Sequence, residues 1–172
     1  MSFSLGARSL SFATHVDPTL IRVVQHALSI STQDAGFTAE QSRTLAEEQA
    51  LVAAGRSHTL KSHHIIGCPG AAPGYSGAVD LVPWLDSGKA FSWQWALIYP
   101  LAVAMRQASI ELSVPITWGG AWDRILSEID VPADGDPADA LRAASDAYVG
   151  RERAKGVRSP LIDGPHYELG RN

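Results

Sequence analysis

The 172-residue sequence has little cysteine, no long hydrophobic run and no excess of basic residues. Its single cysteine, Cys68, excludes an intramolecular disulfide. The longest apolar run, 95–105, is interrupted by Pro100 and is shorter than the about 20 residues that a membrane-spanning helix needs. The formal net charge of -4 gives no basic footprint for nucleic acid. We therefore expect neither nucleic-acid binding nor stable insertion into a membrane.

The N-terminal residues lack a basic segment followed by an apolar core, so we expect no cleaved signal peptide. Hydrophobic residues make up 45% of the sequence and charged residues 19%, as in ordinary globular proteins. The length fits one domain with a sizeable core. We therefore expect a single domain over residues 1–172 that folds in a cytoplasm.

Helix signals recur along the chain. Asp17 and Pro18 predict a helix start, and the apolar residues that follow share one face until about 29–33. Asp136 is expected to cap a helix over 137–153. Two further helices are expected over 42–55, capped by Ser42 or Thr44, and over 93–112, bent or begun anew at Pro100.

Strand signals are short and scattered. We expect strands near 36–39, 78–82, 114–118 and 166–169, the last paired with 161–162 across a tight turn. Residues 1–16 resemble an arm or a short strand, and the Gly- and Pro-rich segment 68–77 and the acidic segment 127–137 are expected to be loops. Short strands between helices of unequal length predict one mixed α+β domain.

Two adjacent histidines and an isolated aspartate suggest a metal site. His63 and His64 precede the Gly/Pro-rich segment, and Asp80 follows it inside an apolar run. An ionised carboxylate among apolar residues is costly unless it is paired or binds a metal. Zinc binds His nitrogen and carboxylate oxygen, and a catalytic site uses three protein ligands. With His166 near the C-terminus, His64 and Asp80 would form such a set around one zinc ion.

The residues leave other ligand sets open. His63 could replace His64, because neighbours in an extended segment point in opposite directions. Cys68 is a softer zinc ligand than Asp80, so a site of His64 and Cys68 is conceivable. Each histidine could also have a purely structural role.

A hydrolytic site also needs a general base beside the attacking water. Asp163 precedes His166 by three residues, and a tight turn would bring both into one cleft. Glu168 would share the face of His166 on a strand, so it competes as base or as partner of the histidine. Arg43 could form a surface ion pair, or its guanidinium could hold a substrate carboxylate or an oxyanion. The segment 118–123, with two glycines that allow close backbone approach, is expected to wall the cleft.

These motifs together resemble those of zinc peptidases that include D-Ala-D-Ala carboxypeptidases and phage L-alanyl-D-glutamate endopeptidases. The resemblance covers about residues 15–170 and implies a hedgehog/DD-peptidase-like α+β domain, with a small antiparallel sheet flanked by helices. The segments that carry it are Ser62–Gly67, Ala78–Leu81, Trp118–Trp122, Asp163–Leu169 and the Arg43-bearing helix.

The resemblance implies a role for each site residue. His64, rather than His63, joins Asp80 and His166 as a zinc ligand. Asp163 is the general base, and Arg43 binds substrate or stabilises the oxyanion. Substrate binding or support of the ligands is expected of Ser62, Trp118 and Glu168.

Two departures from the family pattern stand out. The connection from His64 to Asp80 is longer than in the family by the segment Cys68–Ser76, which must bulge away and still return Asp80 to the metal. Glu48 stands where relatives often have glutamine, which bears on the surroundings of Arg43.

The resemblance implies a monomeric phage endolysin that cuts peptidoglycan stem peptides, most simply at the L-Ala–D-Glu bond. It would wait in the host cytoplasm until release to the periplasm and cell wall, and it would have no separate wall-binding domain. The alternatives are a D-Ala-D-Ala carboxypeptidase on the same fold and a zinc-binding wall or virion module without catalysis.

Overall fold

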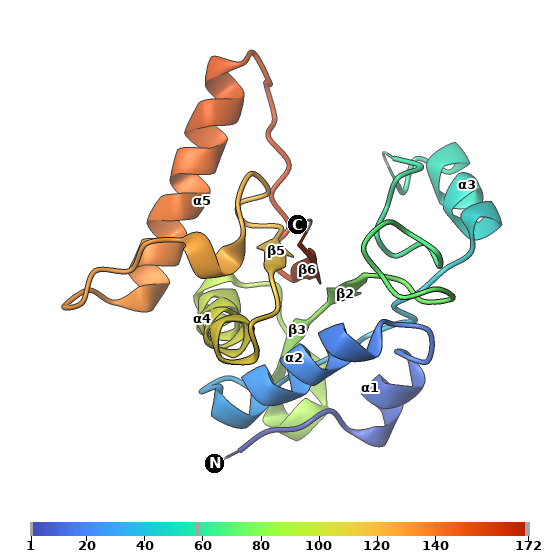
Figure 1. The fold of residues 1–172 in the computed structure, drawn as a ribbon, viewed down its shortest axis with the longest axis horizontal. Helices are drawn as coiled ribbons and strands as arrows, with labels where there is room; N and C mark the ends of the chain where they lie inside the picture. The colour runs from blue at the N-terminus through green and yellow to red at the C-terminus, as the bar shows by residue number, and fades with distance from the viewer. Residues whose placement is uncertain (1, 58, 171–172) are drawn as a thin grey trace.

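Small antiparallel sheets lie at the centre of the structure, with helices around them (Figure 1). The computed structural model describes residues 2–57 and 59–170. Within these ranges the strands form two three-stranded sheets, ordered β1-β3-β4 and β2-β6-β5. The strands are β1 (Ala35–Gly36), β2 (Ala78–Asp80), β3 (Val82–Leu85), β4 (Ala90–Phe91), β5 (Ile116–Trp118) and β6 (His166–Leu169). The predicted α+β class is confirmed.

Three of the helices begin where their capping residues predict, namely α2 (Pro18–Ile30), α3 (Leu45–Ala53) and α5 (Pro137–Ala154). Asp17 accepts a hydrogen bond from the Thr19 N–H at 2.8 Å, and Asp136 accepts one from the Ala138 N–H at 2.8 Å. Thr44 forms a capping box with Glu47. The α-helices are α1 (Ala7–Ser11), α2 (Pro18–Ile30), α3 (Leu45–Ala53), α4 (Trp95–Leu112) and α5 (Pro137–Ala154), with short 3-10 turns η1 (Asp86–Gly88) and η2 (Leu126–Glu128).

The hydrophobic core joins the inner faces of α2 and α4 to strands β5 and β6. All five apolar residues predicted for one face of α2 are buried. Trp118 of β5 and Tyr167 of β6 are among the largest fully buried side chains. The core therefore fixes β6, which carries His166, and β5, which pairs with β6.

Two predictions at the N-terminal side were wrong. Residues 7–11 form the helix α1 instead of an arm or strand, and the buried Ser9 hydroxyl accepts a hydrogen bond from the Phe37 N–H at 3.1 Å. The strand expected at 36–39 is the two-residue β1. Both segments are too short for a periodic pattern, so tertiary contacts decide their structure.

Three predictions around the sheets need correction. The single strand expected at 78–82 is divided at Leu81 into β2 and β3, which belong to different sheets. Residues 161–162 form no strand, because β6 pairs with β2 on one side and β5 on the other. α4 runs through Pro100 without a new start. No helix in the described part of the chain has the length and apolar character needed to span a membrane.

Candidate metal and catalytic site

His64, Asp80 and His166 lie together, although 102 residues separate the two histidines in the sequence. His64 lies in the loop that follows α3, Asp80 ends β2 and His166 begins β6. The antiparallel pairing of β2 with β6 places Asp80 directly opposite His166. The fold therefore assembles the three predicted ligands from three separate segments.

The three potential ligand atoms form a compact triangle. His64 Nε2 lies 3.3 Å from His166 Nδ1 and 3.4 Å from Asp80 Oδ1. His166 Nδ1 lies 3.1 Å from Asp80 Oδ1. In a tetrahedral site with metal–ligand bonds of about 2.0–2.1 Å, neighbouring ligand atoms lie about 3.3–3.4 Å apart. The donor types and their spacing therefore fit a metal ion of the size of zinc.

Hydrogen bonds on the far side of each ring orient the histidines. His64 Nδ1 contacts the Gln41 carbonyl oxygen at 2.6 Å, and His166 Nε2 contacts Glu168 Oε2 at 3.2 Å. A ring N–H that donates there leaves the lone pair of the other nitrogen directed at the metal position. The Asp80 N–H also donates to Gln41 Oε1, at 2.6 Å. Glu168 is therefore a hydrogen-bonding partner of His166.

Gln41 is a site residue that sequence reasoning missed. Its backbone orients His64, while its side chain fixes the backbone of Asp80. Nothing in the sequence indicates this role, because the carbonyl contact depends only on where the chain runs before Arg43.

The contacts within the site favour the charged forms of Asp80 and His166, although burial alone would favour the neutral forms. Burial opposes ionisation of Asp80, yet hydrogen bonds from His166 and His64 hold the pKa of its carboxyl well below the usual range. Burial also opposes protonation of His166, but hydrogen bonds to Asp80 and Glu168 raise its pKa to about 9. The cluster is therefore stabilised by positive charge, which a bound cation would supply.

Asp163 is held beside the ligands through its backbone. Its N–H donates to the Gly119 carbonyl at 2.8 Å, and its carbonyl accepts from the His166 N–H at 3.1 Å. A Cβ on Gly119 would lie 2.2 Å from the Asp163 oxygen, so only glycine fits there. The Trp118 indole N–H donates to the Gly164 carbonyl at 2.7 Å. The segment after β5 thus fixes the turn that carries Asp163 and His166.

The surroundings of Asp163 suit a proton acceptor. Burial, together with the negative charge of Asp80, raises the pKa of its carboxyl group. Within the described residues the Asp163 carboxylate makes no hydrogen bond or ion pair. A carboxylate with a raised pKa and no protein partner is available to accept a proton from a water molecule.

A cavity of about 310 Å³ opens beside His166. The Trp122 ring packs 4.8 Å from the His166 ring, so the 118–123 segment walls this cleft through Trp122, while Trp118 is fully buried. Ser62 lines the cleft, and its hydroxyl accepts a hydrogen bond from the His64 N–H at 3.3 Å. The other lining residues are Thr59, Lys61, His63, Tyr148, Leu161 and Glu168.

His63 lies outside the ligand triangle. Its ring is buried, and Nδ1 lies 3.6 Å from Glu168 Oε2. Of the two neighbouring histidines, His64 therefore belongs to the triangle of potential ligands, and His63 lies beside the carboxylate that contacts His166.

The additional segment Cys68–Ser76 closes at its own base. The Gly67 N–H donates to the Tyr75 carbonyl at 2.9 Å, and the Gly77 N–H donates to the His63 carbonyl at 2.8 Å. The buried Cys68 thiol sits between them, 3.2 Å from the His63 oxygen and 3.1 Å from the Gly77 nitrogen. Cys68 is thus a structural residue of this loop and lies outside the triangle. After this loop the chain enters β2, in which Asp80 pairs with His166.

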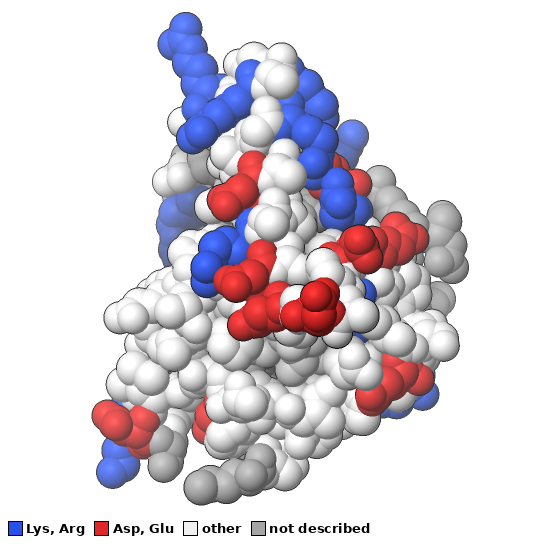
Figure 2. Space-filling model, turned by 90° about the vertical axis from the view of Figure 1, so that its left-hand side faces the viewer, with Lys and Arg blue, Asp and Glu red and all other residues white. Residues whose placement is uncertain are grey.

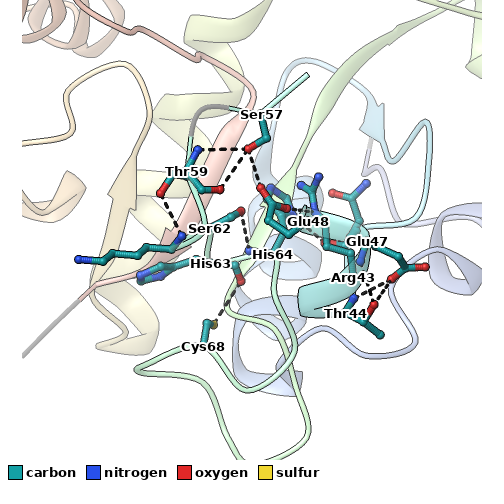
Figure 3. Close-up of polar contacts among 12 residues, drawn as sticks. Arg43, Thr44, Glu47, Glu48, Ser57, Thr59, Ser62, His63, His64 and Cys68 are labelled. Atoms are coloured by element: carbon teal, nitrogen blue, oxygen red, sulfur yellow. Dashed lines mark hydrogen bonds and ion pairs between the residues drawn. The ribbon is translucent and has the colours of Figure 1, made fainter. Parts of the chain in front are cut away.

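Arg43 is tied to the site through its backbone and paired through its side chain. Its N–H donates to the His64 carbonyl at 2.9 Å, and its carbonyl accepts from the Ile66 N–H at 2.9 Å. Its Nε lies 3.2 Å from the buried carboxylate of Glu48 (Figure 3). The Glu48 carboxylate therefore balances the charge of Arg43 and holds its side chain.

The family of this protein follows from the match of its sequence to a protein-family model. The model for phage L-alanyl-D-glutamate peptidases matches residues 1–134. The chain belongs to this family. Asp163 and His166 lie beyond the matched segment, and in this peptidase the pairing of β6 with β2 brings them to the site.

A solved structure extends the similarity over nearly the whole peptidase. The crystal structure of the L-Ala D-Glu endopeptidase ChiX from Serratia marcescens has 27% sequence identity and a TM-score of 0.62, covering 95% of this chain and 87% of that chain. No curated protein matches the sequence. Family and structural relative together indicate L-alanyl-D-glutamate peptidase activity on peptidoglycan, which confirms the predicted enzyme class.

Proposed function

We propose that this peptidase hydrolyses the L-Ala–D-Glu bond of peptidoglycan stem peptides with one zinc ion held by His64, Asp80 and His166. The observation that carries the proposal is the triangle of ligand atoms, 3.1–3.4 Å on each side, with an outward hydrogen bond on each histidine ring. A zinc ion bound there would polarise the amide carbonyl and lower the pKa of a coordinated water to about 7.

We assign the two proton transfers of the reaction to Asp163. Its carboxylate accepts a proton from the attacking water and then delivers that proton to the leaving amine of D-Glu. The raised pKa supports the first step, because it makes the carboxylate a stronger base towards the attacking water. The backbone contacts with Gly119 and His166 keep the carboxylate beside the ligands during the reaction.

A role for Arg43 in the transition state stays a prediction. Glu48 occupies Nε of the guanidinium, and the terminal nitrogens carry further N–H donors that could bind a developing oxyanion. If so, Arg43→Lys should lower kcat and leave the metal content unchanged. An unchanged kcat would limit Arg43 to holding the His64 segment.

The proposed function is tested by digesting purified murein and analysing the products by mass spectrometry. New N-terminal D-Glu is expected, whereas release of free D-Ala would indicate a carboxypeptidase. His166→Ala should abolish both zinc binding and hydrolysis. Full zinc occupancy without turnover on any murein would contradict the proposal and favour a binding module.

A further inference from the structure

Lys61 is a cationic residue of the cleft beside the potential metal ligands, and the described residues offer it no ion-pair partner. Lys61 lines the cavity of about 310 Å³ next to His166 and also the cavity of about 580 Å³ on the other side of Ser62. Its side chain is exposed, and it forms no ion pair within residues 2–57 and 59–170. Lys61 therefore presents to both cavities a positive charge that has no ion-pair partner among the described residues.

Hydrogen bonds hold the backbone of Lys61 in place. Its N–H donates to the Thr59 hydroxyl at 3.0 Å, and the Thr59 N–H contacts the Ser57 hydroxyl at 3.5 Å. The Ser57 hydroxyl in turn donates to the buried Glu48 carboxylate at 2.5 Å (Figure 3). The loop is thus anchored to α3, which fixes where the Lys61 side chain starts.

The other charges near the cleft are already engaged. Arg43 pairs with Glu48 and lines neither cavity. Glu168 contacts His166 Nε2 at 3.2 Å and lies 3.6 Å from His63 Nδ1. Among the described residues that line this cleft, Lys61 is therefore the lysine or arginine that an entering anionic group meets.

The substrate of the proposed reaction brings such a group. The nitrogen of the scissile amide belongs to D-Glu, which has two carboxyl groups, and only one of them continues the peptide. The other is a free carboxylate on the residue that contributes the leaving amine. A lysine ammonium binds a carboxylate with a charge-assisted hydrogen bond.

We propose that Lys61 binds the free carboxylate of D-Glu and makes the peptidase prefer an ionised stem peptide over one amidated at that position. This inference rests on the proposed function, because it assumes cleavage at L-Ala–D-Glu. Lys61 acts on binding and takes no part in proton transfer.

Two synthetic peptides test this proposal. One is L-Ala-γ-D-Glu-L-Lys with a free α-carboxylate on D-Glu, and the other is the same peptide with an α-carboxamide at that position. The native protein should cleave the carboxylate peptide with a kcat/KM about tenfold higher. Lys61→Met should raise KM for that peptide about tenfold, leave kcat unchanged and barely affect the carboxamide peptide. Lys61→Arg should restore much of the preference, and the exposed Lys89→Met is the matched control.

The outcomes separate the two hypotheses. Equal losses on both peptides in Lys61→Met, or no preference in the native protein, would overturn the role of Lys61 while leaving the peptidase activity intact. Cleavage of neither peptide by the native protein, with zinc bound, would overturn the proposed function and this inference with it. Metal content and the thermal midpoint are measured for each variant, so that misfolding is not mistaken for lost recognition.

Discussion

Asp163 and Glu168 are two carboxylates close to His166, and they have different surroundings. Glu168 contacts the outer nitrogen of the His166 ring at 3.2 Å, so it orients a ligand. Asp163 is fixed by its backbone, while its carboxylate makes no hydrogen bond with the described residues. The sequence offers both as candidate bases, and this difference favours Asp163.

Asp163→Asn should separate the chemistry from metal binding. The amide is close to isosteric but cannot accept the proton, so kcat should fall by about 10²–10⁴-fold with unchanged zinc content. Glu168→Gln is the comparison, because it weakens the support of His166 and should lower metal affinity by about 10–100-fold. Zinc titrations and steady-state kinetics on both variants decide which of the two carboxylates is the base. Turnover retained in Asp163→Asn and lost in zinc-saturated Glu168→Gln would move the base to Glu168.

At the residue scale, sequence reasoning named three potential metal ligands that the fold places close to one another. His64, Asp80 and His166 stand in recognisable motifs, and the structure brings them together. It could not find Gln41, because its contacts with the His64 ring and the Asp80 N–H depend on how segments far apart in the sequence meet in the folded protein. It also could not tell that Trp118 is buried and that Trp122 lines the cleft, since both indoles belong to one short motif.

At the element scale, the predictions succeed where the signals are local. Caps and helical periodicity depend on neighbours within a turn or two, so α2 and α5 begin where Asp17 and Asp136 indicate. Strand pairing depends on segments far apart in the sequence. For that reason the position of β6 between β2 and β5, on which the site depends, could not be predicted from the chain order.

An ion pair connects α5 to the segment that carries Trp122. Arg151 donates to both carboxylate oxygens of Asp123, at 2.6 and 3.1 Å. Burial opposes the ionisation of Asp123, but Arg151 and Arg124 lower the pKa of its carboxyl group overall. A lowered native pKa means that this stabilisation is present above the unfolded value, about 3.9, and is lost as the pH falls through the native pKa.

Asp123→Asn should therefore destabilise the protein in a pH-dependent way. We expect a loss of about 0.2–1 kcal/mol in the free energy of unfolding at neutral pH, in the range of partly exposed pairs. The difference from the native protein should shrink as the pH falls below about 4. Urea unfolding at several pH values measures this difference in the free energy of unfolding. Asp139→Asn is the control, because Asp139 forms an exposed pair with Arg142. A difference that grows on acidification would contradict this assignment.

At the scale of the whole molecule, basic side chains gather at the end of α5, away from the acidic residues nearer the middle (Figure 2). Within this group Arg151 pairs with Asp123 and Lys155 with Glu152. Much of the local charge is therefore balanced inside the molecule.

The three potential metal ligands come from parts of the chain that share no helix or strand. His64 belongs to the loop after α3, Asp80 to β2 and His166 to β6 close to the C-terminal end of the described chain. A metal ion at this site would therefore link the N-terminal and C-terminal parts of the domain. Since the unfolded chain cannot hold the three ligands together, binding stabilises the folded state alone.

Removing the metal should lower the thermal midpoint. At a free zinc concentration of about 100 times Kd, binding stabilises the fold by about 2.7 kcal/mol. For a domain of this size, that corresponds to a shift of about 5–11 °C. Calorimetry with a chelator, followed by added zinc, should show the midpoint fall and recover. His166→Ala should remove the zinc-dependent shift, whereas Asp163→Asn should keep it because Asp163 is not a ligand. An equal shift in native and His166→Ala proteins would place the stabilising metal elsewhere.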